Sequence, residues 1–340
     1  MTTEIEYWQT VQKMLRGYRA AQVMITCSQL GIFQHLAEAA QTAPGLAAKT
    51  QTDSNALSRL LNAAVALNLL VKSETGEYTN APLAAVCLAG EGEYFLGRLV
   101  RREGAFYQRW SYLPEAVRSG QRPEANIRDE GQTDWVRDFE LALFDLSRTV
   151  GPAVAEALAL PTGRPFRVLD VGGGHGGYSM ALARRYPHLQ AVVFELPAAA
   201  EVAREIIAGE GMADRVSVQV GDFQKDELGN GFDLLLLFGV LVSETAAGKL
   251  ALLQKSYRAL LPGGRVAIRG FWLDEARTGP PEATLASLHM LLSTDAGDLS
   301  TLAEIEGWLV EAGFVQPELV PLPEWLGSSL LVAHKPTTTP

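Results

Sequence analysis

The chain has 340 residues, more than one hydrophobic core usually supports, so we expect two domains. Its composition is that of a globular protein, with 47% apolar and 20% charged residues. No apolar run reaches the roughly 18 residues of a membrane span, and the N-terminus lacks a targeting signal, so we expect a soluble cytoplasmic protein. The net charge of -10 argues against nucleic acid and anionic membranes as partners.

The cysteine content is low. Cys27 and Cys87 both fall in apolar stretches predicted to be helical, which suits buried thiols better than a disulfide framework or a zinc site. We therefore expect structural thiols and no metal.

The N-terminal region predicts a winged helix. From Glu4 to about Ala40 apolar residues recur at helical spacing, which predicts a strongly helical segment that buries one face. A break at Pro44-Gly45 precedes a short helix and a second helix over residues 55–69. Residues 70–78 then predict a hairpin with a glycine turn.

Some winged helices bind DNA, so this alternative has to be weighed. The second helix carries one arginine, Arg59, between largely apolar residues. A recognition helix needs several polar side chains that reach base edges. We therefore favour packing or dimerisation over DNA binding.

Residues 91–160 predict further helices, with a loop over about 120–133. They contain the aromatic residues Tyr107 and Trp110, which are candidates for the wall of a substrate pocket. The alternative is that these rings fill the core between domains.

From Pro165 the pattern changes to short β-branched runs separated by helices. Apolar strands such as residues 234–237 indicate burial on both faces, and hence a doubly wound parallel sheet covered by helices. Two more runs, 319–323 and 329–334, predict a final antiparallel pair. The predicted parallel strands cover 166–171, 191–195, 216–220, 232–238 and 265–269, and the helices 177–185, 198–208 and 246–261.

A glycine loop follows the first of these strands. Gly172, Gly174 and Gly177 match G-x-G-x-x-G, which is also the pattern of dinucleotide-binding folds. Asp170 favours a different ligand, because a carboxylate beside the loop opposes a pyrophosphate and attracts an ammonium or sulfonium group. The loop therefore suits an amino-acid-bearing cofactor, with its carboxylate held by amides at the helix start.

Acidic residues also end the second and third strands. Glu195 is placed to accept two ribose hydroxyls, and Asp222 to accept an adenine amino group. Phe223 offers a face for stacking the adenine ring. For Glu195 alone a solvated strand end would be an equally good interpretation, but three acids at three successive strand ends favour a ligand site.

With these motifs the chain resembles class I S-adenosylmethionine-dependent methyltransferases, specifically the caffeate and acetylserotonin O-methyltransferase-like family. The resemblance extends over nearly the whole chain. It rests on the winged helix, Trp110 with residues 113–120, the Asp170 glycine loop, Glu195-Leu196-Pro197, residues 221–223, residues 261–264 and residues 311–314.

The resemblance implies a Rossmann-like methyltransferase sheet with an N-terminal helical winged-helix dimerisation domain. We expect this dimerisation domain over 1–100, a helical connector over 101–160 that contributes to the acceptor pocket, and a catalytic domain over 161–340. The family also implies a homodimer, S-adenosylmethionine as cofactor and a small-molecule acceptor. The predicted cofactor-binding residues are Asp170, Gly172, Gly174, Glu195, Leu196, Asp222, Phe223 and Phe238.

The chain departs from this family at the acceptor site. Members that methylate phenols carry a His-Asp pair after the fourth strand, where this chain has Val242 and Ser243. Two supporting glutamates are replaced by Gly270 and Leu299. The usual base is therefore absent, but methyl transfer survives this loss if alignment of the acceptor supplies the rate and the acceptor is acidic.

Three residues are candidates for replacement chemistry: His289, Glu244 and Arg269. The pKa of histidine suits a proton relay, although a structural His289 bonded to backbone is the alternative. Arg269 on a buried strand either holds an anionic acceptor or pairs with a carboxylate. The predicted substrate-contacting residues are Tyr107, Trp110, Val242, His289 and Met290.

The sequence thus predicts methyl transfer to an oxygen of a small aromatic or polyketide-like secondary metabolite. The alternatives are carbon methylation, for example of a tetrapyrrole-like or electron-rich aromatic acceptor, and a reaction that uses the cofactor without methyl transfer, such as hydroxylation, decarboxylation or rearrangement. A catalytically silent dimeric binding protein is a third alternative.

Overall fold

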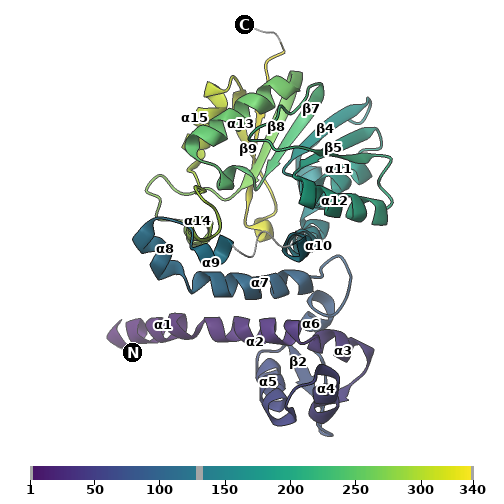
Figure 1. Cartoon of the computed structure of the whole chain (residues 1–340), viewed down its shortest axis with the longest axis vertical. Helices are drawn as coiled ribbons and strands as arrows, with labels where there is room; N and C mark the ends of the chain where they lie inside the picture. The colour runs from purple at the N-terminus through teal and green to yellow at the C-terminus, as the bar shows by residue number, and fades with distance from the viewer. Residues whose placement is uncertain (1–2, 128–132, 338–340) are drawn as a thin grey trace. The chain divides into compact units, whose positions relative to one another are not determined.

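The computed structural model describes residues 3–127 and 133–337, and the chain forms two compact units, Met1–Gln108 and Arg109–Pro340 (Figure 1). The predicted connector, residues 101–160, is therefore divided between them, with residues from 109 onward in the second unit. Part of the predicted loop over 120–133, namely residues 128–132, lies outside the described residues.

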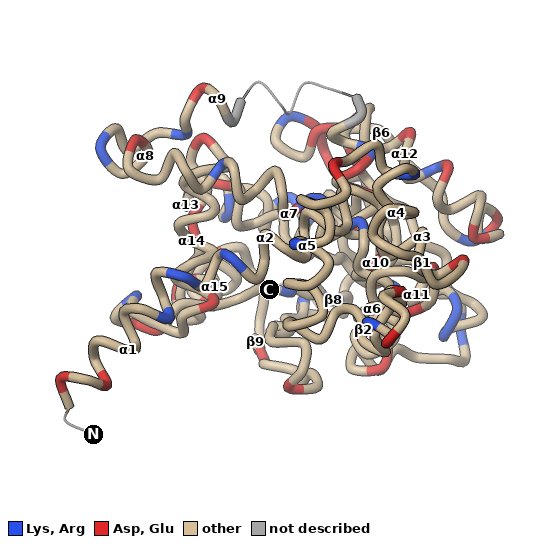
Figure 2. Tube along the Cα trace, turned by 90° about the horizontal axis from the view of Figure 1, so that it is seen from below, with Lys and Arg blue, Asp and Glu red and all other residues tan. Residues whose placement is uncertain are grey.

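The N-terminal helical segment is broken twice. It forms α1 (Thr3–Arg16), α2 (Tyr18–Gln29) and α3 (Ile32–Glu38), so the predicted helical segment is present as three helices. The second break lies at Gly31, whose φ of 67° is left-handed and therefore incompatible with a continuing helix. In α1 acidic residues occupy the first turn and basic residues the last, which suits the helix dipole (Figure 2).

The winged helix is present. It consists of β1 (Gln41–Thr42), α4 (Ala43–Thr50), α5 (Ser54–Ala66), β2 (Leu70–Lys72) and β3 (Glu77–Asn80). Its three strands pair in the order β1-β3-β2. Asp53 caps α5 by accepting the N–H of Ala56, and the buried Leu57, Leu61 and Ala64 tie α5 to the core of this unit.

Further helices follow the winged helix. They are α6 (Pro82–Cys87), α7 (Gly97–Trp110), α8 (Leu113–Ser119), α9 (Glu124–Ile127) and α10 (Thr133–Ala157). The long helix α10 belongs to the second unit and contacts α11 and α12.

The second unit is built on a seven-stranded sheet with the order β6-β5-β4-β7-β8-β10-β9. The five strands from β6 to β8 are parallel, and β10 pairs antiparallel with β8 and β9. The strands are β4 (Phe166–Val171), β5 (Leu189–Glu195), β6 (Val216–Val220), β7 (Phe232–Phe238), β8 (Leu260–Gly270), β9 (Val315–Val320) and β10 (Ser329–His334). The helices are α11 (Gly177–Arg185), α12 (Pro197–Gly209), α13 (Ala246–Ala259), α14 (Pro281–Ser293) and α15 (Leu302–Glu311). The doubly wound sheet predicted from the sequence is thus confirmed.

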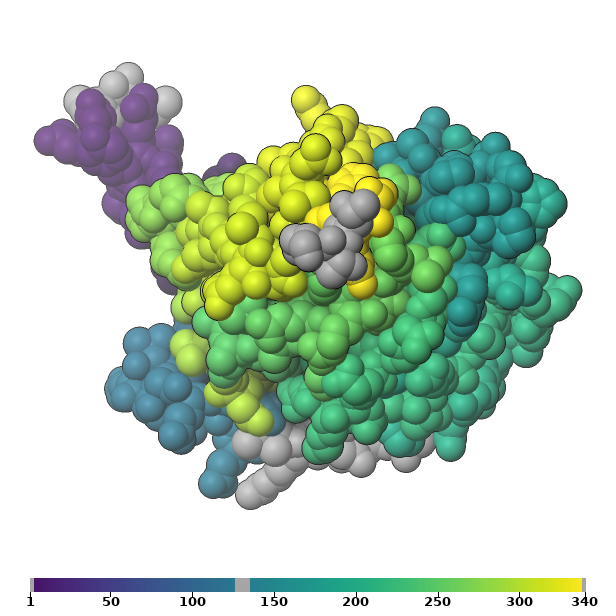
Figure 3. Space-filling view, turned by 90° about the horizontal axis from the view of Figure 1, so that it is seen from above, coloured from purple at the N-terminus to yellow at the C-terminus, as the bar shows by residue number. Residues whose placement is uncertain are grey.

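Two apolar cores cover the two faces of this sheet. Val168 faces the core formed with α10, α11 and α12, whereas the next residue, Leu169, faces the core formed with α13 and α15. This alternation is what a strand buried on both faces requires. In Figure 3 the yellow C-terminal residues pack against green residues of the preceding segments, consistent with the contact between α13 and α15.

The strand order reverses between β4 and β7. In open parallel sheets such a switch point opens a crevice at the carboxyl ends of the strands, where ligands bind. The glycine loop after β4 and the segment after β7 lie at this point. The fold therefore places the predicted cofactor loop and the predicted acceptor residues side by side.

Other sequence expectations concern thiols, metals and membranes. Cys27 is buried and Cys87 half-buried, and both are free; burial raises the pKa of Cys27 to about 12. Over residues 3–127 and 133–337, no helix combines the length and hydropathy needed to cross a bilayer. The same described residues contain no cluster of three or more His, Cys, Asp or Glu side chains suited to a metal.

Candidate cofactor and acceptor site

The glycine loop leaves β4 in a conformation that requires glycine. Gly172 and Gly174 have φ angles of 60° and 48°, in the left-handed region. A Cβ atom on Gly172 would lie 2.2 Å from Val240, and one on Gly174 would lie 2.3 Å from Oε2 of Glu140. Side chains are excluded at both positions, so the loop backbone lies open to a ligand at close range.

Asp170 lies directly below this loop on β4 and is 1% exposed. Its Oδ2 accepts a hydrogen bond of 2.8 Å from the hydroxyl of Ser179 on α11. Burial raises the pKa of Asp170 to about 7, with a further contribution from the nearby Glu195. A carboxyl group in this state binds most favourably a ligand that brings positive charge.

Glu195 ends β5, the strand next to β4. Its Oε2 accepts the N–H of Gly174 at 3.0 Å, and its Oε1 accepts the N–H of Leu196 at 2.7 Å. Burial raises the pKa of Glu195. The structure thus joins the predicted ribose-binding residue to the glycine loop itself.

Asp222 and Phe223 follow β6, the third strand of this group. In the structure Asp222 accepts the N–H of Gln224 at 2.9 Å and the ammonium of Lys225 at 2.7 Å. The hydrogen bond from Lys225 is the main reason that the pKa of Asp222 is lowered. The Phe223 ring lies 3.9 Å from the point where a Cβ atom on Gly172 would be, so this ring borders the glycine loop.

A cavity of about 440 Å³ runs from the glycine loop to the ends of β7 and β8. It brings together seven of the predicted site residues. These are Asp170, Gly172, Gly174, Phe238, Val242, Arg269 and Met290. Every residue of its lining belongs to the second unit.

The acceptor end of this cavity is apolar. Leu299 is buried in a small cluster in which Val242 and Met290 are partly buried. Val242 and Leu299 both line the cavity, and so does Gly270. Three of the positions expected to depart from the family pattern, Val242, Gly270 and Leu299, are therefore in the cavity wall, whereas the fourth, Ser243, is not.

Arg269 is the one arginine or lysine that lines this cavity among the described residues. Its Nη1 donates to the hydroxyl of Tyr178 at 3.0 Å, and its guanidinium lies 5.7 Å from the centre of that ring. Its Nε is buried without a hydrogen-bond partner in the described part of the chain, as is Oγ of Ser328, another residue of the lining. Two donors in the cavity wall thus have unused capacity.

The other predicted residues lie outside this cavity lining. Glu244 accepts a hydrogen bond of 2.8 Å from Gln224 and lines a separate surface pocket with Phe223. His289 lies on α14, and its Nε2 is 3.3 Å from Oγ of Ser293. Tyr107 belongs to the first unit, where its ring centre lies 6.3 Å from that of Tyr18.

Comparison with known proteins decides the family. Residues 110–315 match a model described as an O-methyltransferase domain, and residues 12–90 match one described as an O-methyltransferase dimerisation domain. The chain belongs to the O-methyltransferase family. The second match supports the homodimer expected from the sequence, and the exposed apolar side chains of α1, such as Trp8, Val11 and Leu15, are consistent with it.

Several members of the O-methyltransferase family are similar to this chain over most of its length. The 3-hydroxy-5-methyl-1-naphthoate 3-O-methyltransferase of Streptomyces sahachiroi is 33% identical over 87% of this chain and 86% of its own. The L-tyrosine C(3)-methyltransferase of Streptomyces lavendulae is 29% identical over 95% and 91%. The crystal structure of human N-acetylserotonin methyltransferase in complex with SAM has a TM-score of 0.87 and 26% identity, covering 99% of this chain and 100% of that one.

S-adenosylmethionine is the cofactor of this family, and the residues of the loop end fit it. The two glycines leave room that a Cβ atom would fill, and the carboxyls of Asp170, Glu140 and Glu195 surround the loop. One oxygen of Glu140 is buried without a partner within the described residues. Such a set of carboxyl groups suits a ligand with both an ammonium and a sulfonium group.

Sequence reasoning missed Glu140. It lies on α10, 7% exposed, between the apolar residues Phe139 and Leu141. An acidic residue on an otherwise apolar helix face was the available signal, but the sequence did not show that this face covers the glycine loop. The cavity lining also includes His175 of the glycine loop, whose pKa burial lowers to about 3.

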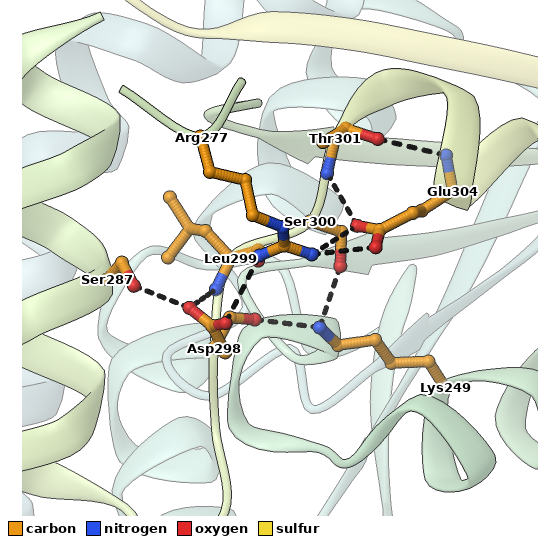
Figure 4. A network of polar contacts seen from close by, with 8 residues as sticks. All are labelled: Lys249, Arg277, Ser287, Asp298, Leu299, Ser300, Thr301 and Glu304. Atoms are coloured by element: carbon orange, nitrogen blue, oxygen red, sulfur yellow. Dashed lines mark hydrogen bonds and ion pairs between the residues drawn. The ribbon is translucent and has the colours of Figure 1, made fainter. Parts of the chain in front are cut away.

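A polar network holds the segment that carries Leu299 (Figure 4). Lys249 of α13 donates to the carbonyl of Asp298 at 2.7 Å and to the hydroxyl of Ser300 at 2.8 Å. Arg277 contacts Asp298 at 3.3 Å and Glu304 of α15 at 2.6 Å. Ser287 of α14 donates to Asp298 as well, so three helices fix this part of the acceptor wall.

Proposed function

We propose that this O-methyltransferase methylates an acidic hydroxyl of a small aromatic or polyketide-like secondary metabolite, which enters the cavity already ionised. The observation that carries the proposal is the pairing of an apolar wall at Val242 with the guanidinium of Arg269 in one cavity. Position 242 carries no base, and the proton-accepting side chains of the lining, Asp170, Glu140 and His175, belong to the loop end of the cavity. At the acceptor end Arg269 stabilises an oxygen that has already lost its proton.

The cofactor and the residues of the cavity have different roles in this reaction. When bound, S-adenosylmethionine supplies an electrophilic methyl group on a sulfonium. Arg269 and Ser328 have donors for the acceptor's anionic oxygen, while Val242, Met290 and Leu299 exclude water and hold the ring. Because the proton is lost to solvent beforehand, the transfer itself needs no base.

The relatives support an aromatic acceptor. One is named for an oxygen of a hydroxynaphthoate and another for a ring carbon of tyrosine. Carbon methylation is therefore the second candidate for this chain. It is favoured by the same missing base, since an electron-rich carbon attacks before it loses its proton. The roles predicted for His289 and Glu244 have less support, because both lie outside the cavity lining.

The experiment compares phenols of rising acidity, such as 4-cyanophenol and 4-nitrophenol, with purified protein and S-adenosylmethionine. We expect release of S-adenosylhomocysteine in a 1:1 ratio with a methyl ether, and a kcat/KM that follows the ionised fraction of each phenol. Mass spectrometry separates methyl ethers from ring-methylated phenols. Methylation at carbon alone, or acceptor conversion without S-adenosylhomocysteine, would overturn the proposal.

Arg269→Met tests the residue that carries the argument. We expect kcat/KM for 4-nitrophenol to fall about tenfold or more, because a hydrogen bond to a charged group contributes about 1.5–3 kcal/mol. The affinity for S-adenosylhomocysteine should change less than about twofold. Arg265→Met, on the same strand but outside the cavity lining, is the matched control and should leave both values unchanged.

A further inference from the structure

Glu140 stands out among the buried ionisable groups because no lysine or arginine among residues 3–127 and 133–337 forms an ion pair with it and because it has no place in the predicted site. Its carboxyl accepts the backbone N–H of His175, and its Oε2 has no hydrogen-bond partner among the described residues. An orphaned buried acceptor of this kind is unfavourable unless a ligand supplies a donor. Since Glu140 lines the cavity, a ligand in the cavity can supply one.

The position of Glu140 specifies which part of a ligand it meets. The carboxyl lies directly over the glycine loop, since a Cβ atom on Gly174 would be 2.3 Å from its Oε2. Glu195 bonds the N–H of the same Gly174, so this residue has a carboxyl on two sides. Two carboxyls that flank the loop in this way suit a ligand group that carries an ammonium.

The electrostatic surroundings favour a cation at this point. Glu195 of β5 acts electrostatically on Glu140, and Asp170 of β4 lines the same cavity; both are acidic. Burial, followed by repulsion from Glu195, raises the pKa of Glu140 to about 8. His175, on the loop itself, stays neutral because burial lowers its pKa to about 3. A cationic ligand group is what this cluster lacks.

We propose that Glu140 binds the α-ammonium group of the cofactor's amino-acid moiety, making α10 part of the cofactor site. This inference rests on the cavity being the S-adenosylmethionine site. The unpaired Oε2 accepts a charge-assisted hydrogen bond from the ammonium. Glu140 thereby distinguishes the intact cofactor from adenosine compounds that lack the amino acid.

The experiment measures binding by calorimetry at pH 8 to two probes. S-adenosylhomocysteine has the amino-acid moiety, whereas 5′-methylthioadenosine has the adenosine and the thioether but no amino acid. We expect Glu140→Gln to weaken the binding of S-adenosylhomocysteine about tenfold and the binding of 5′-methylthioadenosine less than twofold. Glu156→Gln, an exposed position on the same helix outside the cavity lining, is the matched control and should leave both unchanged.

The outcomes separate this proposal from its alternatives. Equal weakening of both probes means that Glu140 acts only through the shape of the site, and unchanged affinity means that it does not meet the ammonium; either result overturns the proposal. A neutral Glu140 that donated to the cofactor's carboxylate would tolerate Gln and give the second result. Failure of the unmutated protein to bind either probe would instead refute the cavity as the cofactor site.

Folding of the variant is checked by thermal denaturation. Since burial disfavours the ionised carboxyl, Glu140→Gln should be as stable as the unmutated protein at pH 8. Glu140→Asp provides a second variant that keeps the charge on a shorter side chain. We expect it to retain more affinity for S-adenosylhomocysteine than Glu140→Gln does, and the reverse order would contradict the proposal.

Discussion

The two ends of the cavity differ in chemistry. At the loop end the carboxyls of Asp170, Glu140 and Glu195 cluster without a lysine or arginine partner in the described part of the chain. At the acceptor end the wall is apolar except for Arg269, its hydrogen-bond partner Tyr178, and Ser328. The loop end keeps the pattern of the O-methyltransferase family, and the acceptor end carries the departures at Val242, Gly270 and Leu299. We infer that this chain differs from other phenol-methylating members in how the acceptor loses its proton, while the cofactor stays the same.

The largest expected effect comes from removing the central carboxyl of the loop end. Asp170→Ala should weaken the binding of S-adenosylhomocysteine by about 30- to 100-fold, since a hydrogen bond or ion pair to a charged group contributes about 1.5–3 kcal/mol. Calorimetry measures the loss. Ser179→Ala, which removes only the hydroxyl bonded to Asp170, should have a smaller effect in the same direction.

A buried aspartate elsewhere in the sheet is the control for this comparison. Asp233 lies on β7 and binds Arg164 at 2.7 Å and the N–H of Arg167 at 2.8 Å. Asp233→Ala should lower the stability of the protein but leave the affinity for S-adenosylhomocysteine within twofold. An equal loss of affinity in both variants would mean that the loop end has no special role.

The pH dependence of cofactor binding should be a tenfold effect. Asp170 and Glu140, with pKa values of about 7 and about 8, are largely protonated at pH 6 and ionised above pH 8. A cationic ligand prefers the ionised carboxyls, so affinity for S-adenosylhomocysteine should rise about tenfold between pH 6 and pH 8.5. Affinity that stays flat or falls over this range would show that these carboxyls do not meet a cation.

The stability of the unliganded protein should change in the opposite direction. A carboxyl whose pKa is raised by folding stabilises the protein fully below its unfolded pKa, here 4.5 for Glu140, and this stabilisation is lost as the pH rises through the folded value of about 8. Urea denaturation at pH 5.5 and pH 8.5 should therefore show a lower free energy of unfolding at the higher pH. Glu140→Gln should reduce this difference.

The smallest effect should come from His289 at the acceptor end. His289→Ala should change kcat for an acidic phenol less than about twofold, because the side chain lies outside the cavity lining and contacts Ser293. Steady-state kinetics tests this. A loss of tenfold or more, with an altered pH profile, would restore His289 as a proton relay and contradict an acceptor that enters ionised.

The parallel sheet was predictable from the sequence because its strands are apolar runs bounded by glycine, proline or charge. The bounds of β4, β6 and β7 match the predicted ranges. The break at Gly31 was missed because the apolar spacing continues across it, although the backbone turns there through a left-handed residue. Periodicity detects the faces of helices better than their interruptions.

The candidate site was predictable where it depends on strand ends and not where it depends on packing between elements. Asp170 lies near the end of β4 and Val242 shortly after the end of β7, so the predicted strands were enough to locate both residues. Glu140 reaches the glycine loop only because α10 packs over α11, and no local pattern reveals that. Glu244 is close to Val242 in the chain, but its side chain reaches Gln224 instead of the cavity.

In the network around Asp298, the groups that hold the acceptor wall in place are different from the side chain that faces the acceptor. Backbone atoms and the charged side chains of Lys249, Arg277 and Glu304 hold the segment in place, while the Leu299 side chain takes no part in these bonds. A substitution at residue 299 therefore leaves these polar contacts in place and acts through the packing of the buried side chain. Acceptor preference in this fold is open to change one side chain at a time.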